Sequence, residues 1–400
     1  MDFFSRTFRG DRTIWCIFVL LCIISLLEVF SATSTIVYKL QSHWSPILRH
    51  AAFLLIGFGC VMFIQRVPTK LFSLLILVLP LSCILLIVTM FIGADVNGAQ
   101  RWLGVGAITI QPSEIAKLAA VGFMAFFLSR MNAQNEKSIF KIIIIGIGVT
   151  CILIVPENLS TAFLLFVVCF LMMFIGQVAW KKLAIIVIAC VTFALLLGGI
   201  LKLVPESAMD KYFPDRFATW KARIDRHSDE PQLEGAADPS EYVITKYNFQ
   251  PTHAKIAIAN GNVIGLPGSG MERDFLPQAY SDFIYAIILE EMGLIGGIVV
   301  LLLYFALIIR AGMLARKCEK LFPKYLLMGS ALMLTMQALI NMAVAVNLIP
   351  VTGQPLPLIS RGGTSTIITC IYFGIILACS NIKEEEHEDV DEDIANVQFE

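Results

Sequence analysis

The chain has 400 residues, of which 57% are hydrophobic and 15% are charged, and its formal net charge is −1 at pH 7. The mean hydropathy is +0.78. These values exclude an ordinary soluble domain and place the chain among integral membrane proteins. The near-zero charge argues against nucleic acid as a partner. The 10 cysteines show neither metal-ligand spacing nor a disulfide framework.

Ten apolar stretches are each long enough to cross a bilayer as a helix. The first follows Arg6, Arg9 and Arg12, and no convincing small-residue cleavage site comes after it, so we interpret it as a membrane span and not as a removed signal peptide. The sequence therefore predicts an all-α polytopic membrane protein. The expected spans are about 13–32, 48–65, 71–93, 112–131, 139–155, 159–177, 183–204, 282–309, 325–348 and 358–380.

A long polar segment, 205–281, separates the seventh and eighth expected spans. Lys and Arg gather in the loops on the side of the N-terminus, whereas the opposite short loops hold few basic residues. Because cytoplasmic loops are enriched in Lys and Arg, both termini are predicted to be cytoplasmic and 205–281 to be extracytoplasmic. The membrane domain covers 1–382, and the acidic remainder, 383–400, is predicted to be a disordered cytoplasmic tail. The expected cytoplasmic basic residues are Arg6, Arg9, Arg12, Arg66, Lys70, Arg130, Lys137, Lys141, Lys181, Lys182, Arg310, Arg316, Lys317, Lys320 and Lys324.

Charged residues inside the expected spans are costly in a membrane and usually have a partner or a function. Glu114 and Lys117 are three residues apart and so share one helix face. They either form an internal ion pair that locks helix packing or contribute to a substrate site, and the sequence leaves both open. For Glu28, Glu290 and Glu291 we expect hydrogen bonds between helices.

Asp282 lies where the long polar segment meets the eighth span, at the outer rim of the membrane. It admits two interpretations. Either Ser281 or Asp282 caps the first turn of the helix, or Asp282 is a working group of a functional site.

Three outer segments, 97–104, 110–117 and 350–365, are rich in Gly and Pro, with Pro112 suited to the first position of a helix. Such broken backbone at membrane depth is tolerated only where protein or a water-filled cavity covers it. We therefore expect a polar cavity that opens to the outer leaflet beside Asp282 and takes an anionic ligand from the membrane. Its expected positive lining is Arg49, Arg101, Lys117, Arg216 and Arg223.

Four motifs in these segments form a specific set. They read Asn97-Gly-Ala-Gln-Arg-Trp102, Gln111-Pro-Ser-Glu-Ile-Ala-Lys117, Pro277-Gln-Ala-Tyr-Ser-Asp-Phe-Ile284 and Pro350-Val-Thr-Gly-Gln-Pro-Leu-Pro357. Together they resemble the SEDS family (shape, elongation, division and sporulation), over nearly the whole chain. Within that family the chain looks more like the division member FtsW than the elongation member RodA.

The resemblance implies a peptidoglycan glycosyltransferase of the bacterial cytoplasmic (inner) membrane that polymerises lipid II into glycan strands. It implies a class B penicillin-binding transpeptidase as partner, together with other membrane proteins of the divisome. The family's essential acid matches Asp282. The predicted substrate-binding residues are Arg49, Arg101, Gln111, Glu114, Lys117, Arg216, Arg223 and Ser360.

The chain departs from the family pattern at several places. Tyr280 and Ser281 stand where many relatives carry His-Thr, His50 stands where Gln is common, and Arg361 stands where an aromatic residue is usual. None of these departures replaces the acid itself.

The chemistry can also be argued from the residues. Glycoside hydrolysis needs two carboxylates, because one of them must protonate a poor leaving group. The pyrophosphate of lipid II is already a good leaving group, so one general base, Asp282, can suffice, with inversion at the anomeric carbon. Cationic side chains or a divalent cation such as Mg²⁺ or Mn²⁺ would offset the charge of the departing pyrophosphate. The sequence does not fix whether a metal is required, and no cofactor is certain.

Three alternatives stay open. A lipid II flippase would also need a cationic cavity, but it predicts inverted repeats, and we find no such symmetry in the sequence. A scaffold of the division machinery would not need an acid at the outer rim. A RodA-like elongation polymerase would differ in its cellular role and not in its chemistry.

Overall fold

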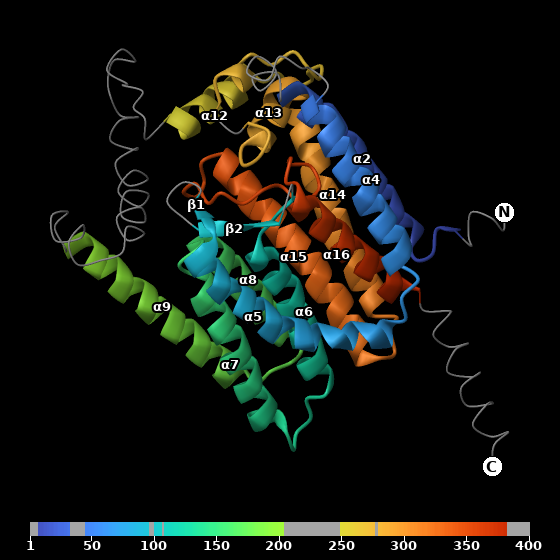
Figure 1. Cartoon of the computed structure of the whole chain (residues 1–400), viewed down its shortest axis with the longest axis vertical. Helices are drawn as coiled ribbons and strands as arrows, with labels where there is room; N and C mark the ends of the chain where they lie inside the picture. Colours follow the sequence, from blue (N-terminus) through green and yellow to red (C-terminus); the bar gives the residue numbers. More distant parts are fainter. Residues whose placement is uncertain are drawn as a thin grey trace.

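The computed structural model describes residues 7–32, 45–95, 100–105, 108–203, 249–276 and 279–381. Its helices form one bundle with both described ends of the chain on the same side (Figure 1). The acidic tail 383–400 and residues 205–248 of the expected outer segment lie outside the described residues. The helices before the long segment are α2 (Arg12–Ala32), α4 (Ser45–Ile64), α5 (Leu75–Ile92, preceded by η1, Thr69–Leu74), α6 (Pro112–Ser129), α7 (Glu136–Ile154), α8 (Leu159–Ile175) and α9 (Trp180–Leu203).

After the long segment, the chain forms two short helices and four further ones. These are α12 (Phe249–Asn260), η3 (Glu272–Asp274), α13 (Ile284–Glu291), α14 (Gly293–Ala315), α15 (Leu321–Ala345) and α16 (Thr364–Ser380). Within the described residues, 7 helices are long and apolar enough to cross a membrane, and α8 and α16 are shorter apolar helices. Each expected span contains a helix, so the prediction of a polytopic helical membrane protein is confirmed.

The eighth span differs from the prediction because it is divided into α13 and α14. Gly293 begins α14 with a φ of +73°, and a Cβ at this position would lie 2.5 Å from the carbonyl oxygen of Asn262. Only glycine therefore fits this junction without strain. The span also begins at Ile284 and not at 282, because residues 279–283 form turns.

The last span also begins later than predicted. Residues 358–363 are loop, and α16 begins at Thr364, with Gly363 at the N-cap and a φ of 55°. The glycine pair 362–363 therefore ends an irregular segment. Hydropathy alone did not separate this segment from the helix that follows it.

A small antiparallel sheet is a further difference from an all-helical prediction. Its three strands are β1 (Ala94–Asp95), β2 (Gln100–Val105) and β3 (Ile108–Ile110), in the order β1-β2-β3. Strand pairing satisfies backbone N–H and C=O groups that a loop would leave unpaired near the membrane. The sheet leads directly into α6, where Pro112 occupies the first turn, as predicted.

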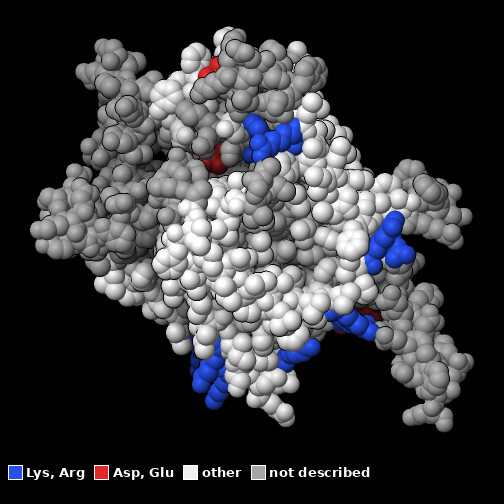
Figure 2. Space-filling view, in the orientation of Figure 1, with Lys and Arg blue, Asp and Glu red and all other residues white. Residues whose placement is uncertain are grey.

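The core of the bundle is built around α15, which packs against α6, α8, α14 and α16. Small residues allow close approach, since a Cβ at Gly329 would lie 2.6 Å from Met172 Cε of α8. On the face drawn in Figure 2, most of the visible Lys and Arg side chains gather at the end away from α12 and α13. That end is the one predicted to be cytoplasmic.

Candidate active site

Asp282 lies in the turn that precedes α13 and is half-buried. The N-cap residue of α13 is Phe283, with no capping side-chain hydrogen bond. Of the two interpretations that the sequence left open, the one in which Ser281 or Asp282 caps this helix is therefore wrong. Instead, Ser281 Oγ donates to Asp282 Oδ1 at 3.0 Å. Asn341 of α15 donates from Nδ2 to the Asp282 backbone oxygen at 2.8 Å and holds the turn against the bundle core.

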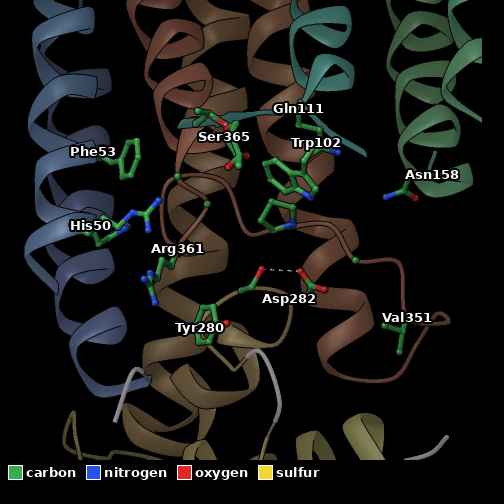
Figure 3. A pocket seen from close by; sticks show the side chains of 18 of the residues that line it. His50, Phe53, Trp102, Gln111, Asn158, Tyr280, Asp282, Val351, Arg361 and Ser365 are labelled. Atoms are coloured by element: carbon green, nitrogen blue, oxygen red, sulfur yellow. Dashed lines mark hydrogen bonds between the residues drawn. The ribbon is translucent and has the colours of Figure 1, made fainter. Parts of the chain in front are cut away.

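The Asp282 side chain lines a cavity of about 450 Å³. Figure 3 shows residues from distant parts of the chain converging on it. The cavity is lined by Arg49, His50, Phe53, Trp102, Thr109, Gln111, Asn158, Gln250, Tyr280, Ser281, Asp282, Val351, Gly353, Pro355, Arg361, Gly362, Gly363, Thr364 and Ser365.

The segment 350–355 forms one wall of the cavity and is fixed by amides of α15. Asn341 Nδ2 donates to the oxygen of Gln354 at 2.8 Å, and Gln337 Nε2 donates to the oxygen of Pro355 at 3.0 Å. Gly353 has a φ of +70°, and a Cβ there would lie 3.7 Å from Asp282 Oδ2. The backbone of this segment therefore passes directly beside the carboxylate.

The segment 356–361 is tied to the turn that carries the acid. Ser360 Oγ accepts from the backbone N–H of Leu356 at 2.7 Å and donates to the oxygen of Ser281 at 2.6 Å. The backbone N–H of Arg361 donates to the oxygen of Tyr280 at 2.9 Å. These bonds couple the position of Asp282 to the loop before α16.

One side of the cavity is cationic. The Arg361 guanidinium lies over the Tyr280 ring, with Cζ 5.4 Å from the ring centroid. Burial lowers the pKa of Arg361, Tyr280 opposes that shift, and the neighbouring charge of Arg49 adds to it. Among the described residues, neither Arg49 nor Arg361 forms an ion pair. The other side presents amides, from Gln111 and from Asn158 at the start of α8.

Three predicted site residues line the cavity: Asp282, Arg49 and Gln111. Ser360 is buried and forms the link between loops described above. Arg216 and Arg223 lie outside the described residues. Arg101 lies in β2 beside the lining residue Trp102, but its side chain is not described.

Glu114 and Lys117 form a buried ion pair, with 2.7 Å between Nζ and Oε1, and do not line the cavity. Lys117 Nζ also donates to Gln337 Oε1 at 2.9 Å. The ion pair left open by the sequence is therefore present, and it supports the same Gln337 that holds the cavity wall. A role of the pair in substrate binding stays a prediction.

His50, Trp102, Asn158 and Arg361 also line the cavity but are not among the predicted site residues. Three of them had a signal, because His50 and Arg361 depart from the family pattern and Trp102 ends one of the family motifs. Asn158 had none, since it occupies a tight connection between two apolar helices. Within the described residues, no group of three or more His, Cys, Asp or Glu side chains could hold a metal ion.

A bundle of membrane helices with one carboxylate in a partly cationic cavity defines a class, that of polytopic membrane proteins with a polar cavity at one end of the bundle. The chain belongs to the FtsW/RodA/SpoVE family of cell cycle proteins, whose family model matches residues 11–385.

Relatives with assigned names match most of the chain. It is 32% identical over 379 residues to the probable peptidoglycan glycosyltransferase FtsW of Haemophilus influenzae, which covers 92% of this chain and 89% of the relative. It is 29% identical over 381 residues to the FtsW of Aliivibrio salmonicida, with coverages of 92% and 88%. It is 27% identical over 373 residues to the peptidoglycan glycosyltransferase MrdB of Escherichia coli, with coverages of 92% and 92%.

Solved structures share the fold. A chain of a peptidoglycan synthase complex, studied for the coordination of polymerization and crosslinking, aligns with a TM-score of 0.71 at 23% identity, covering 93% of this chain and 97% of that one. The rod shape determining protein RodA of Thermus thermophilus aligns with a TM-score of 0.63 at 22% identity, with coverages of 93% and 96%.

Proposed function

We propose that this protein is a peptidoglycan glycosyltransferase that polymerises lipid II, with Asp282 as the general base. The observation that carries the proposal is the position of Asp282 in a cavity between cationic and amide-bearing walls. The activity named for the FtsW and MrdB relatives supports the reaction type.

In this proposal each group has a task. The Asp282 carboxylate accepts the proton of an acceptor sugar hydroxyl as that oxygen attacks the donor's anomeric carbon. The bond from that carbon to the phosphate oxygen breaks, and the electron pair leaves with the diphosphate. Arg49 stabilises the developing negative charge, and Gln111 is placed to bind sugar or peptide polar groups. Because the attack is in line, the anomeric configuration is inverted.

We place the protein in the bacterial cytoplasmic membrane with both termini in the cytoplasm and the cavity facing outward. The basic residues near the ends of α2, α7, α14 and α15 support this orientation. The similarity to FtsW relatives favours a role in cell division. Because the chain is also similar to MrdB, a role in elongation is the alternative. We propose a class B penicillin-binding protein and other divisome membrane proteins as partners, because the neighbouring fold occurs in a complex that joins polymerization to crosslinking.

The test is polymerisation of labelled lipid II by the purified protein and by Asp282→Asn, with Glu319→Gln as a control for an exposed carboxylate at the other end of the bundle. Loss of a general base lowers rates by about 100- to 10,000-fold. We expect Asp282→Asn to lose strand synthesis while it keeps the thermal unfolding temperature of the wild type. Glycan strands of ordinary length from Asp282→Asn would refute the proposal.

The flippase alternative predicts a different result in the same preparation. A transporter moves lipid II across vesicle membranes without joining sugars, and it has no need for a proton acceptor at this position. Transport by the wild type without strand synthesis, unchanged in Asp282→Asn, would favour the flippase.

A further inference from the structure

Of the described residues of α12, Gln250 is the one that lines the cavity. It lies in the first turn of the helix, and its side chain forms no hydrogen bond with another described residue. A side-chain amide offers two N–H donors and a carbonyl acceptor. In a polar cavity, such an amide can bind hydroxyl or amide groups of a ligand.

The two ends of α12 are held unequally by packing. α12 packs against α13, and both lie at the same end of the bundle (Figure 1). Just after α12 ends, a Cβ at Gly261 would lie 2.3 Å from the carbonyl oxygen of Leu289, so the backbone there touches α13 directly. Nearer to Gln250, the buried residues are Thr252 and Ala254, whose small side chains bury little apolar area. The position of Gln250 therefore needs a further contact.

His253, one turn after Gln250, supplies that contact. Its Nδ1 lies 2.6 Å from Glu272 Oε2, and the two side chains are only 12% and 13% exposed. Because a carboxylate only accepts hydrogen bonds, Nδ1 carries the proton and donates it. The imidazole also packs on Phe249 and Phe275, with ring centroids 4.2 Å and 6.1 Å away. Shielding from water strengthens the bond to the carboxylate.

Glu272 is in turn fixed to α13. Its backbone N–H donates to Glu290 Oε1 at 3.1 Å, and the N–H of Met271 donates to the same oxygen at 2.9 Å. Glu290 belongs to α13, the helix that follows the turn carrying Asp282. His253 therefore links the first turns of α12 to the helix next to the acid.

We propose that Gln250 binds a polar group of the lipid II headgroup, and that His253 is a positioning residue that holds Gln250 at the cavity through its hydrogen bond to Glu272. The inference rests on the proposed function and deepens it, since it adds α12 to the walls that bind the substrate. Without this bond, the first turn of α12 is free to move while the end at Gly261 stays against α13. The Gln250 amide then loses its fixed direction.

The experiment measures equilibrium binding of a labelled lipid II analogue that lacks the acceptor hydroxyl, so that no strand forms. In the purified full-length protein, Gln250→Ala should raise the dissociation constant by about three- to tenfold, the effect of one neutral hydrogen bond. His253→Ala and Glu272→Ala should each raise it by a similar factor. Asn260→Ala removes an exposed amide from the other end of the same helix and, as the matched control, should keep the wild-type value.

A double variant distinguishes positioning from a general loss of structure. If His253 acts through Gln250, the double variant Gln250→Ala/His253→Ala should bind no more weakly than Gln250→Ala, because one contact cannot be lost twice. Losses that multiply in the double variant overturn the positioning role.

His253→Asn is the conservative variant, because its amide places an N–H donor where Nδ1 stands. It should bind the analogue within about twofold of the wild type. Binding as weak as that of His253→Ala would overturn the assignment to the Glu272 bond. If His253→Ala does not fold, Glu272→Ala decides, because it keeps the backbone N–H that Glu290 binds. A raised dissociation constant then supports the inference, and an unchanged one overturns it.

The failure of this inference and the failure of the proposed function have different signs. Binding of the analogue needs no general base, so polymerisation by Asp282→Asn overturns the function and leaves this measurement as it is. An unchanged dissociation constant in Gln250→Ala, or no measurable binding by the wild type, overturns the inference even when Asp282→Asn is inactive.

Discussion

At the scale of single residues, Gly353 shows how the backbone makes room beside the acid. Its φ is +70°, and an added Cβ would lie 3.7 Å from Asp282 Oδ2. Gly353→Ala should therefore cost about 1 kcal/mol of stability and, by filling space next to the carboxylate, lower the polymerisation rate by about tenfold or more. Lipid II polymerisation and thermal unfolding measure the two effects.

Gly268→Ala is the matched control for that substitution. Gly268 has a φ of +90°, but no atom lies within 4 Å of its added Cβ. It should show a similar loss of stability without the loss of rate. Equal losses of rate in both variants would mean that backbone strain, and not the space beside Asp282, is responsible.

Asn341 is a positioning residue, since its amide holds both Asp282 and the neighbouring wall through their backbone oxygens. Asn341→Ala removes two buried hydrogen bonds and should destabilise the protein by about 1–3 kcal/mol. Because the carboxylate loses its fixed place, we expect kcat to fall with little change in KM for lipid II.

The control on the same helix is Ser330→Ala. Ser330 Oγ is buried and has no hydrogen-bond partner among the described residues, so its loss should be nearly neutral. A rise in KM at constant kcat in Asn341→Ala would contradict the positioning role.

The sequence could predict a site residue where the chemistry of its side chain and its position in a motif both indicated the same role. Asp282 is an acid at the end of a polar segment, and Arg49 is a cation at the rim of an expected span. Arg361 was not predicted as a site residue, because the sequence does not show that the loop carrying Arg361 folds onto Tyr280. Ser360 was predicted to bind substrate from its motif alone, but its hydroxyl is occupied by two backbone groups.

At the scale of elements, the buried pair Glu114–Lys117 joins α6 to α15 through Gln337. Lys117→Met should destabilise the protein by about 3–5 kcal/mol, because it leaves Glu114 as an unpaired buried charge. Glu114→Gln combined with Lys117→Met removes both charges and should recover most of that loss. Thermal unfolding of the two variants gives the comparison.

The activity of the double variant distinguishes a structural role of the Glu114–Lys117 pair from a role in substrate binding. If the pair only supports the cavity wall, the folded double variant should polymerise lipid II at a rate within about tenfold of the wild type. An inactive but stable double variant would assign the pair to substrate binding.

Helix positions were predictable because a membrane span needs a long apolar run. The break between α13 and α14 was not, because Gly293 lies inside one long expected span and the turn is required by contacts with Asn262 and Val263, which are distant in the chain. The sheet was missed for a related reason. Its strands are two to six residues long, and their pairing depends on the register of Leu103 opposite Ile110, which hydropathy does not encode.

At the scale of the whole molecule, the class and the order of the spans followed from hydropathy, whereas the shape of the cavity did not. Each wall of the cavity comes from a different part of the chain, from α4 through the sheet and α8 to the loop before α16. Tertiary packing around α15 brings these walls together, and a sequence pattern that is local in the chain carries no information on that packing.

At the opposite end of the bundle, Asp11 directly precedes α2 and bonds to α14 and α16. Its carboxylate accepts from Arg310 Nη2 of α14 at 2.6 Å, and its backbone N–H donates to Ser380 Oγ of α16 at 2.9 Å. Burial alone would raise the pKa of Asp11, but the hydrogen bonds and charge of Arg310 and the N–H groups of Ile14 and Thr13 outweigh it. The pKa is held below its ordinary value of 3.8.

A lowered pKa in the folded state predicts the sign of the pH dependence. The contribution of Asp11 to stability is fully present above the unfolded value and is lost as the pH falls through the folded value. Asp11→Asn keeps an oxygen that can cap α2 but removes the charge. The unfolding temperature of the wild type should therefore exceed that of Asp11→Asn at pH 7, and the two should converge below about pH 4.

Arg310→Gln provides the check on this prediction, because it removes the cation and leaves Asp11 in place. Its unfolding temperature should also converge with that of the wild type as the pH falls, since protonated Asp11 no longer attracts the guanidinium. A difference between wild type and Asp11→Asn that stays constant from pH 7 to pH 3 would show that Asp11 stabilises the bundle end through its hydrogen bonds and not through its charge.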